Sequence, residues 1–363
     1  MRCGRRLISF GILHKLIFGT AFSYSLNNGC VFRSSRLFSS VTVQSLNLKD
    51  VAIPSSIWHA DAIHHSSAID NLLYPPGESL KARTHAIRYH PIYNFLHTYY
   101  SYSVSNLKKY SPGFDSLLEC DNSLSEVDQE YLKYNLIKRK GNSYSYELPS
   151  NLSTPDGIYG WIKLSRTRDI MVLTASRPAF YGCFGLHEWA MLYSGRKNQS
   201  IPLDRHQKHI PLRVSQSVID NVVESSTIRC THFDAFRFFH PDAKSLNVIH
   251  PLTRDNQIEH EQPGCVHATM DLFKYAYQLY PFVSSSLLRD CITLAIIARK
   301  IDMRASPYDV STVEGCESPL CVESAEGRKS YMEEQERLSQ LAIPIRAKLI
   351  DAYDLALSKL STH

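Results

Sequence analysis

The chain has 363 residues, of which 44% are hydrophobic and 21% are charged. These fractions are ordinary for a globular protein and argue against a disordered chain, a collagen-like repeat or a pure coiled coil. No apolar run of about 18 or more uncharged residues appears, so no membrane span is expected. The length suffices for one large domain or two modest ones.

Residues 1–38 have the composition of an organelle targeting presequence. They hold six Lys or Arg among Ser, Leu and Phe, and the first acidic residue is Asp50. Arg36-Leu37-Phe38-Ser39 resembles a matrix-protease cleavage pattern, whereas Gly19-Thr20-Ala21-Phe22 resembles the signal-to-transit junction of a plastid with extra membranes. His14 and Lys15 interrupt the apolar run that the plastid pattern needs. We therefore expect that the protein is located in the mitochondrial matrix, with the plastid stroma as the alternative location. The alternative to a cleaved presequence is a retained disordered tail.

The net charge of +5 originates in this leader. Without its six cations, 34 Lys or Arg (40 minus six) face 35 Asp or Glu. A near-neutral mature protein gives no charge argument for nucleic-acid binding. The charge is uneven, however, because residues 161–260 carry 13 Lys or Arg against nine acids. Any anion-binding site should therefore lie in this central part.

The nine cysteines include no CxxC pair. This spacing indicates reduced thiols rather than a zinc ribbon, and a disulfide scaffold would be unusual in so long a chain with an organelle address.

The first half of the chain predicts a small sheet among a few helices. Residues 39–80 are typical of a weakly structured segment, and 81–363 are expected to form one globular domain. Pro91 fits the first turn of a helix through HPIYNFLHTYYSYS. A further helix is predicted over 126–139, with strands near 143–148 and 158–175.

The second half is predicted to be helical. Helices are expected in FGLHEWAMLY, in SQSVIDNVVES with Ser215 as its cap, and in PGCVHATMDLFKYAYQLY. Ser284 caps a helix over 284–302, and helices over 325–341 and 344–360 should be separated by Pro344. The fold class is therefore α+β and helix-rich, with a small sheet early and a mostly helical C-terminal half.

Histidines are concentrated in the middle of the chain, where eight of the 16 lie between Tyr181 and Asp271. They occur in or near the runs GCFGLHEWAMLYSG, THFDAFRFFHPD and EHEQPGCVHATMD, together with carboxylates and aromatic rings. Because histidine titrates near neutral pH and binds metals, we expect any chemistry in this region.

The pair His187-Glu188 follows Gly182 and Gly185, which let the backbone approach a ligand at a helix start. The two side chains diverge by about 100° on a helix. Since the second histidine of an HExxH motif is also missing, a metalloprotease of that class is excluded. The alternative is a helix-surface carboxylate beside a hydrogen-bonded, half-buried histidine.

His267 and Asp271 are one helical turn apart, and Lys274 continues their face. A carboxylate at that spacing can fix the tautomer of a histidine that acts as a base or a metal ligand. A routine surface pair has the same spacing.

In THFDAFRFFHPDAK, His232 and Asp234 would share a face of an extended strand. Aromatic rings beside Arg237 suit the stacking of an extruded base and the binding of a phosphate. Core packing of the phenylalanines and an ion pair of Arg237 with a nearby acid are the alternatives.

Two further segments could contribute to the site. The basic loop from Asp204 to Arg213 could present charge to a phosphate or a carboxylate, or be merely solvated. The aromatic helix with His97 and Tyr99 could cover the central site, although core packing is the simpler role.

Six segments together resemble a family of mainly bacterial proteins labelled 3-methyladenine DNA glycosylases, over roughly residues 85–355. They are HPIYNFLHTYYSYS, LKKYSPG, GCFGLHEWAMLY, IRCTHFDAFRFF, EQPGCVHATMDLFKYAY and DMRASPYDV. The resemblance implies removal of an alkylated base from DNA. Neither the Gly-rich hairpin nor the zinc-binding set of known alkyl-base glycosylases is present, so the resemblance assigns no site residue.

Three functions follow as hypotheses. A DNA glycosylase would need no cofactor and would bind DNA. Its predicted catalytic residues are His187, Glu188, His232 and Asp234, and its predicted substrate-binding residues are Trp189, Arg205, Arg213, Phe236 and Arg237.

The alternative is a non-haem metal enzyme that acts on a small-molecule substrate, with iron or zinc as its cofactor. Its predicted metal ligands are His187, His232, His267 and Asp271. A non-enzymatic binding module is the third hypothesis.

Overall fold

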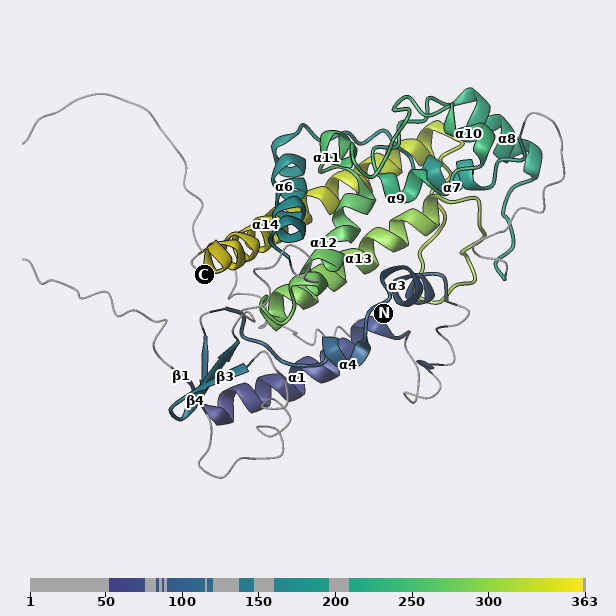
Figure 1. Ribbon diagram of the computed structural model, residues 1–363. Helices are drawn as coiled ribbons and strands as arrows, with labels where there is room; N and C mark the ends of the chain where they lie inside the picture. The colour runs from purple at the N-terminus through teal and green to yellow at the C-terminus, as the bar shows by residue number, and fades with distance from the viewer. Residues whose placement is uncertain are drawn as a thin grey trace, which may run out of the picture. The chain divides into compact units, whose positions relative to one another are not determined.

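The computed structural model describes residues 52–75, 83–84, 87, 90–114, 116–119, 137–146, 160–195 and 209–361. The expected targeting presequence lies outside these residues. The fold is α+β and rich in helix, with a small sheet early in the chain and a helical C-terminal half, so the predicted fold class is confirmed (Figure 1).

The sheet has four short strands in the order β1-β2-β4-β3. β1 (Ala52–Ile53) runs parallel to β2 (Leu117–Glu119), which pairs antiparallel with β4 (Ser143–Tyr146). β4 forms a hairpin with β3 (Ile137–Lys140), and Gly141 takes the left-handed conformation in the turn, with φ of 60°. The strand predicted near 143–148 is confirmed. The predicted helix over 126–139 is wrong at residues 137–139, which belong to β3, because the hairpin pairing overrides local propensity; its other residues lie outside the described ones.

Two helices occupy segments for which the sequence predicted something else. α1 (Ser55–Leu73) crosses the segment expected to be weakly structured and buries Trp58, Ile69 and Leu73 on one face. α6 (Trp161–Ser176) replaces the strand expected over 158–175. Its buried side chains recur at three- and four-residue steps, which is the periodicity of a helix: Leu164, Thr167, Ile170, Met171 and Thr174.

Three long helices form the centre of the fold. α12 (Val266–Leu279) packs along α13 (Ser285–Ala305), and α14 (Ala325–Ser361) packs against both of them and against α6 (Figure 1). The predicted cap of α13 is confirmed, since the Ser284 hydroxyl accepts a hydrogen bond from the Leu287 amide at 3.2 Å.

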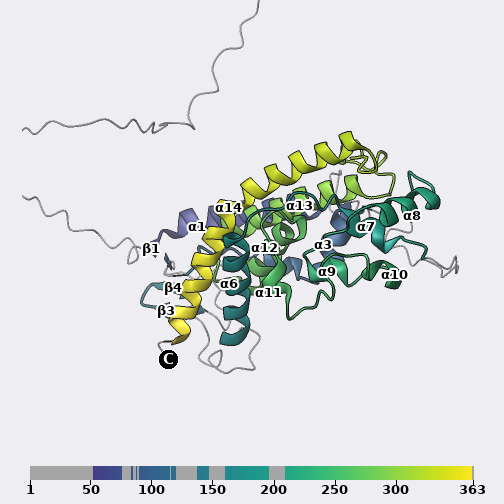
Figure 2. The ribbon, with the colours of Figure 1, turned by 90° about the horizontal axis from the view of Figure 1, so that it is seen from above.

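α14 is one continuous helix, so the predicted break at Pro344 is wrong. Proline lacks the N–H that would bond one turn back, which bends a helix without necessarily ending it. Figure 2 shows α14 changing direction along its length. Buried side chains on both sides of the proline, including Leu338, Ala342, Leu349 and Tyr353, hold the two halves against the core.

Shorter helices surround this centre. They are α3 (Tyr93–Tyr100), α4 (Val104–Leu107), α7 (Leu186–Met191), α8 (Gln216–Ser225), α9 (Phe233–Phe236), α10 (Pro241–Lys244) and α11 (Gln257–His260). The helices predicted after Pro91, in FGLHEWAMLY and after Ser215 are confirmed. No described helix has the length and apolarity needed to cross a membrane.

Candidate metal centre

Three side chains from three helices meet in the interior. His187 comes from the first turn of α7, His267 from the first turn of α12 and Asp302 from the last turns of α13. All three are buried, and one potential ligand atom from each lies within 4.8 Å of the others. Two imidazoles and one carboxylate at such separations form a set that could hold a single metal ion.

Two atoms of this set lie against each other. His187 Nε2 and Asp302 Oδ1 are 2.8 Å apart, an ion pair when the imidazole is protonated, and neither has a well-oriented hydrogen bond to any described residue. The His267 ring lies edge-on to the His187 ring, with 4.6 Å between centroids. Buried polar atoms are normally paired, so a nitrogen and an oxygen this close suit either a buried ion pair or a shared cation.

The charges of two of the three groups, His267 and Asp302, suit a cation. Burial favours the neutral form of His187, but the Asp302 carboxylate outweighs this and raises the His187 pKa above its usual value. Burial, together with the neighbouring His187, places the pKa of His267 well below its usual range, so this imidazole is neutral. Despite its own burial, Asp302 stays ionised, because His187 and Arg299 hold its pKa low. The neutral His267 and the ionised Asp302 are in the forms that bind metals, whereas His187 would have to release its proton when an ion binds.

A buried ion-pair network supports Asp302 from behind. Arg299 Nη1 lies 2.5 Å from Asp302 Oδ2 and 2.8 Å from Glu188 Oε1. The guanidinium also lies over the Phe95 ring of α3, 4.1 Å from its centroid. Arg299 therefore orients the carboxylate through one oxygen and leaves the other, Oδ1, facing His187. The predicted divergence of His187 and Glu188 holds, since the two contact different partners in the same network.

A small cavity adjoins the two histidines. It measures about 20 Å³, room for roughly one water molecule. Its lining includes His187, His267 and three cysteines: Cys183, Cys230 and Cys265. Burial raises the pKa of each thiol, that of Cys230 to about 12, so the cysteines face the cavity as neutral, weakly polar groups.

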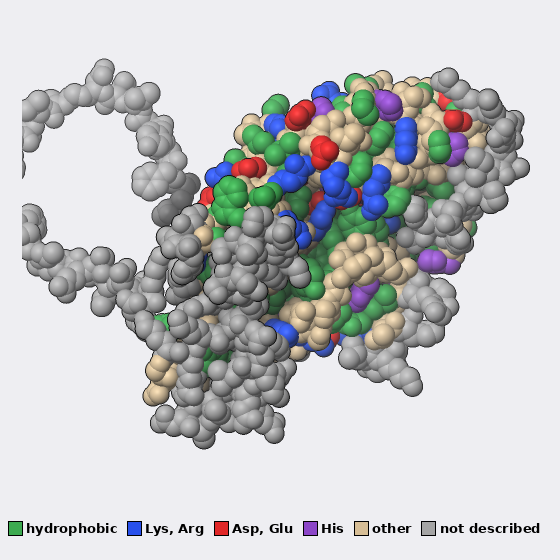
Figure 3. Space-filling view, in the orientation of Figure 1, with side chains coloured by type: hydrophobic (Ala, Val, Ile, Leu, Met, Phe, Trp, Pro, Cys, Tyr) green, Lys and Arg blue, Asp and Glu red, His purple; other side chains and the backbone are tan. Residues whose placement is uncertain are grey.

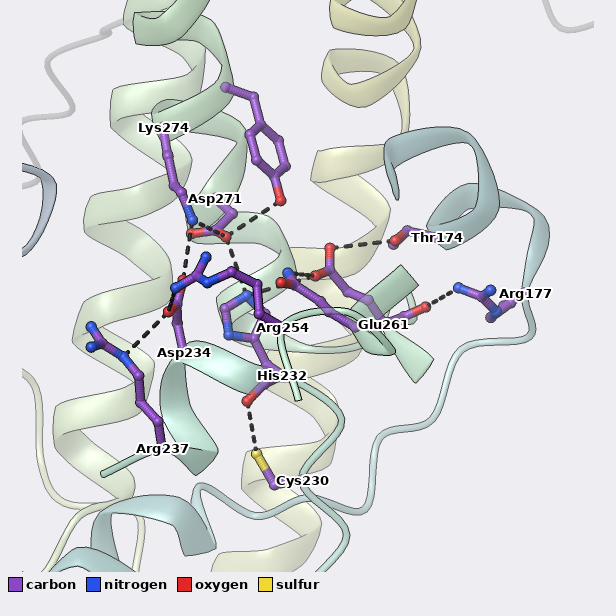
Figure 4. Close-up of polar contacts among 12 residues, drawn as sticks. Thr174, Arg177, Cys230, His232, Asp234, Arg237, Arg254, Glu261, Asp271 and Lys274 are labelled. Carbon is purple, nitrogen blue, oxygen red and sulfur yellow. Dashed lines mark hydrogen bonds and ion pairs between the residues drawn. The ribbon is translucent and has the colours of Figure 1, made fainter. Parts of the chain in front are cut away.

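A second polar cluster is centred on His232, whose ring stacks on that of His267 with 5.3 Å between centroids. His232 Nε2 lies 3.2 Å from Asp271 Oδ2 and 3.7 Å from Glu261 Oε2 (Figure 4). Burial opposes a charge on His232, but Asp271 raises its pKa above the usual value. The imidazole is thus held as a donor to Asp271, whereas His232 Nδ1 is buried without a hydrogen-bond partner in the described part of the chain.

Asp234 gathers three cations at the outer end of this second cluster (Figure 4). Lys274 Nζ lies 3.2 Å from its Oδ2, and Arg254 Nη2 and Arg237 Nε lie 3.0 and 3.3 Å from its Oδ1. Lys274 also lies 3.1 Å from Asp271, which joins the outer cations to His232.

The structure brings together some predicted site residues and separates others. The His267 ring contacts the rings of both His187 and His232, but His232, predicted as a metal ligand, is not among the three residues whose ligand atoms lie within 4.8 Å of one another. Asp271, however, contacts His232 rather than His267, so the predicted tautomer-fixing pair one turn apart does not form. Both of its members are buried, which also excludes the surface-pair alternative.

Sequence reasoning missed Asp302, which takes the place expected for Asp271. One signal could have identified it. Cys291, Ala295, Ala298 and Asp302 recur at four-, three- and four-residue steps, so Asp302 continues the apolar stripe of α13. A carboxylate on a buried stripe needs a partner inside the protein.

The predicted base-binding aromatics lie in the core. Trp189 is fully buried and donates its indole N–H to the Ala305 carbonyl oxygen, and Phe236 packs on Phe239. Arg213 lies over Trp189 and is paired with Glu323.

Two other sequence predictions have different outcomes. The predicted extended face of His232 and Asp234 is wrong, because α9 begins directly after His232. Arg205 lies outside the described residues, and so does most of its loop.

Comparison of the chain with protein-family models, with curated proteins and with solved structures found no match.

Proposed function

We propose that the protein is a metal-dependent enzyme whose ion binds to His187, His267 and Asp302. One observation carries the proposal. His187, His267 and Asp302 are all buried, and one ligand atom of each lies within 4.8 Å of the others, with His187 Nε2 and Asp302 Oδ1 only 2.8 Å apart. The proposal keeps two of the histidines predicted from the sequence and replaces Asp271 by Asp302.

Iron(II) is the ion that this donor set favours. Two histidines and one carboxylate with open positions are typical of non-haem iron enzymes, whereas zinc accepts the same atoms in a tetrahedral arrangement. A bound ion would supply Lewis acidity or an activated water to a small substrate. The chain itself would keep His267 neutral and Asp302 ionised, exclude bulk water and hold Asp302 in place through Arg299.

Elemental analysis of purified full-length protein tests the proposal. We expect close to one equivalent of iron or zinc after gentle purification, and a loss of most of it in Asp302→Asn and in His267→Ala. His64→Ala is the matched control, since His64 is exposed on α1. Less than about 0.2 equivalents of any transition metal in the unmodified protein would contradict the proposal.

Base excision is the second candidate function, and exposed pairs of a cation and an aromatic ring favour it. Arg237 lies over Phe238 at 4.2 Å and Arg254 over Phe233 at 5.1 Å. Such pairs suit nucleic-acid strands. The test is a titration with duplex DNA. We expect binding at low salt and a steep fall in affinity as the salt concentration is raised. An absence of binding at low salt would remove this candidate.

A further inference from the structure

A cluster of three cations lies at the surface end of the polar network: Arg237, Arg254 and Lys274. The Arg237 and Arg254 side chains are 44% and 58% exposed, whereas the Asp234 side chain that they share is only 5% exposed. In Figure 3, Lys and Arg side chains gather on the face over α9, α11 and the adjoining part of α12. The central excess of basic residues in the sequence is thus concentrated around one carboxylate.

The cations of this cluster outnumber its anions. Among the side chains in direct contact with these cations, Arg237, Arg254 and Lys274 contribute three positive charges against two negative ones from Asp234 and Asp271, which leaves one in excess. Bringing like charges together is unfavourable unless an anion neutralises them. A ligand with a negative charge would complete the neutralisation.

The arrangement leaves donors available to such a ligand. A guanidinium has five N–H groups, and Arg237 and Arg254 each use one nitrogen on Asp234 among the described residues. Phe238 and Phe233 lie under the two guanidinium planes and limit their orientations. Planar donors held in this way bind carboxylates and phosphates through paired hydrogen bonds.

Tyr99 of α3 adds an unused hydroxyl. Its oxygen is buried and has no hydrogen-bond partner among the described residues, and its ring stacks on Phe95 at 4.8 Å. Burial raises the pKa of Tyr99, and the Asp271 and Asp234 carboxylates raise it further, so the phenol is neutral. A neutral phenol there is a donor for an anionic oxygen.

The cluster is connected to the candidate metal centre. Lys274 contacts Asp271, Asp271 contacts His232, and the His232 ring stacks on His267. Figure 4 shows the contacts that lead from the outer arginines through Lys274 and Asp271 to His232. A molecule bound to the cations would therefore lie at the outer end of a continuous polar path to the buried histidines.

We propose that Arg237, Arg254, Lys274 and Tyr99 bind the carboxylate or phosphate group of a small organic anion, and that Asp234 holds the cations in position. The anion site deepens the proposed function, because it names the class of substrate. That the anion is a substrate rests on the proposed function, whereas the binding of the anion does not. A small anion fits better than a nucleic acid because residues 39–363 are close to neutral and the cation excess here is a single charge.

Calorimetric titration of the full-length, chelator-treated protein with inorganic phosphate, malonate or a short single-stranded oligonucleotide tests this site at low ionic strength. We expect saturable binding of phosphate or malonate, weakened about tenfold or more in Arg237→Gln/Arg254→Gln and severalfold in Tyr99→Phe. The tighter of the two anions identifies the group. Arg168→Gln/Arg337→Gln is the matched control, because both of these arginines pair with carboxylates on exposed helix faces. Tyr99→Phe keeps the ring and its stacking, so the test survives if the double variant fails to fold.

Three results would overturn the site: no saturable binding of either small anion, equal weakening in the control pair, or binding of the oligonucleotide alone. Failure of the metal centre is distinguishable from these. His267→Ala should lose the metal yet bind the anion, whereas Arg237→Gln/Arg254→Gln should keep its metal content and lose the anion.

Discussion

His65 is a buried histidine whose two ring nitrogens are both engaged. Its Nε2 lies 2.8 Å from the Leu107 carbonyl oxygen, and its Nδ1 lies 2.8 Å from Arg289 Nη1. Arginine can only donate, so Nδ1 must accept and Nε2 must carry the proton. The ring is therefore neutral. Burial, opposed in part by the bond to Leu107 and aided by Arg289, lowers its pKa to about 4.

This shift predicts acid sensitivity. The folded pKa of about 4 lies below the unfolded value of 6.5, so the unfolded chain takes up the proton first as the pH falls. The contribution of His65 is complete above pH 6.5 and is lost between about pH 6.5 and 4. Near pH 5 the loss should be about 2 kcal/mol.

Urea unfolding at pH 7.5 and pH 5 measures this loss. His65→Gln can accept from Arg289 and donate to Leu107 but does not titrate, so it should lose about 2 kcal/mol less than the unmodified protein on acidification. The exposed His64→Gln is the control and should behave like the unmodified protein. Identical losses in His65→Gln and the unmodified protein would contradict the assignment.

At the scale of single residues, the sequence predicted the histidines of the site but not their partners. His187 and His267 stood out because histidines are concentrated between Tyr181 and Asp271. The pairing of His267 with Asp271 was inferred from helical spacing, which brings two side chains to one face of a helix but does not exclude a contact with another element. Asp271 contacts His232 instead, which lies 39 positions earlier in the chain. Such a contact depends on tertiary packing and has no local signature.

The start of α14 depends on a glycine. A Cβ built at Gly327 would lie 2.0 Å from the Cys321 carbonyl oxygen, and the Gly327 amide donates to the Ser324 hydroxyl at 3.0 Å. The backbone of the loop before α14 thus passes so close to Gly327 that only the hydrogen atoms of a glycine fit between them. Gly327→Ala should lower the free energy of unfolding by about 2 kcal/mol or more, although alanine is the better helix former.

Thermal or urea unfolding checks this expectation, with Lys329→Ala as the control on the exposed side of the same turn. A gain in stability for Gly327→Ala would mean that the loop moves aside at no cost and that the close approach is unimportant.

At the scale of elements, errors arose where packing outweighs a local signal. Pro344 correctly marked a disturbance in α14, but the buried residues on either side keep the two halves in one helix. Residues 161–176 alternate weakly in polarity, and their helical stripe includes Thr167 and Thr174, which no hydropathy pattern counts as apolar. Ser284 was predictable because a cap acts within one turn of the chain.

For the whole molecule, the candidate site is an assembly rather than a motif. His187, His267 and Asp302 lie on three helices, and the intervals between them are 80 and 35 positions. Composition and periodicity were enough for the α+β class, but the meeting of these helices follows from the packing of α12 on α13 and of α7 beside them. A site of this kind forms only when the core forms, so its ligand and its fold should be thermodynamically linked.

That linkage gives a prediction for thermal stability. An ion that binds the folded state alone stabilises it by about 2.7 kcal/mol at a free concentration 100 times its Kd. For a domain of this size we expect the Tm of the metal-depleted protein to rise by about 5 °C when iron(II), under anaerobic conditions, or zinc is restored. The rise should be absent in His187→Ala and in Asp302→Asn, which lack a ligand, and preserved in His64→Ala. Differential scanning calorimetry with and without the ion measures it. An equal rise of the Tm in the ligand-deficient variants would show that the stabilising ion binds elsewhere, because the removal of a ligand would then not change the stability that the ion confers on the three helices.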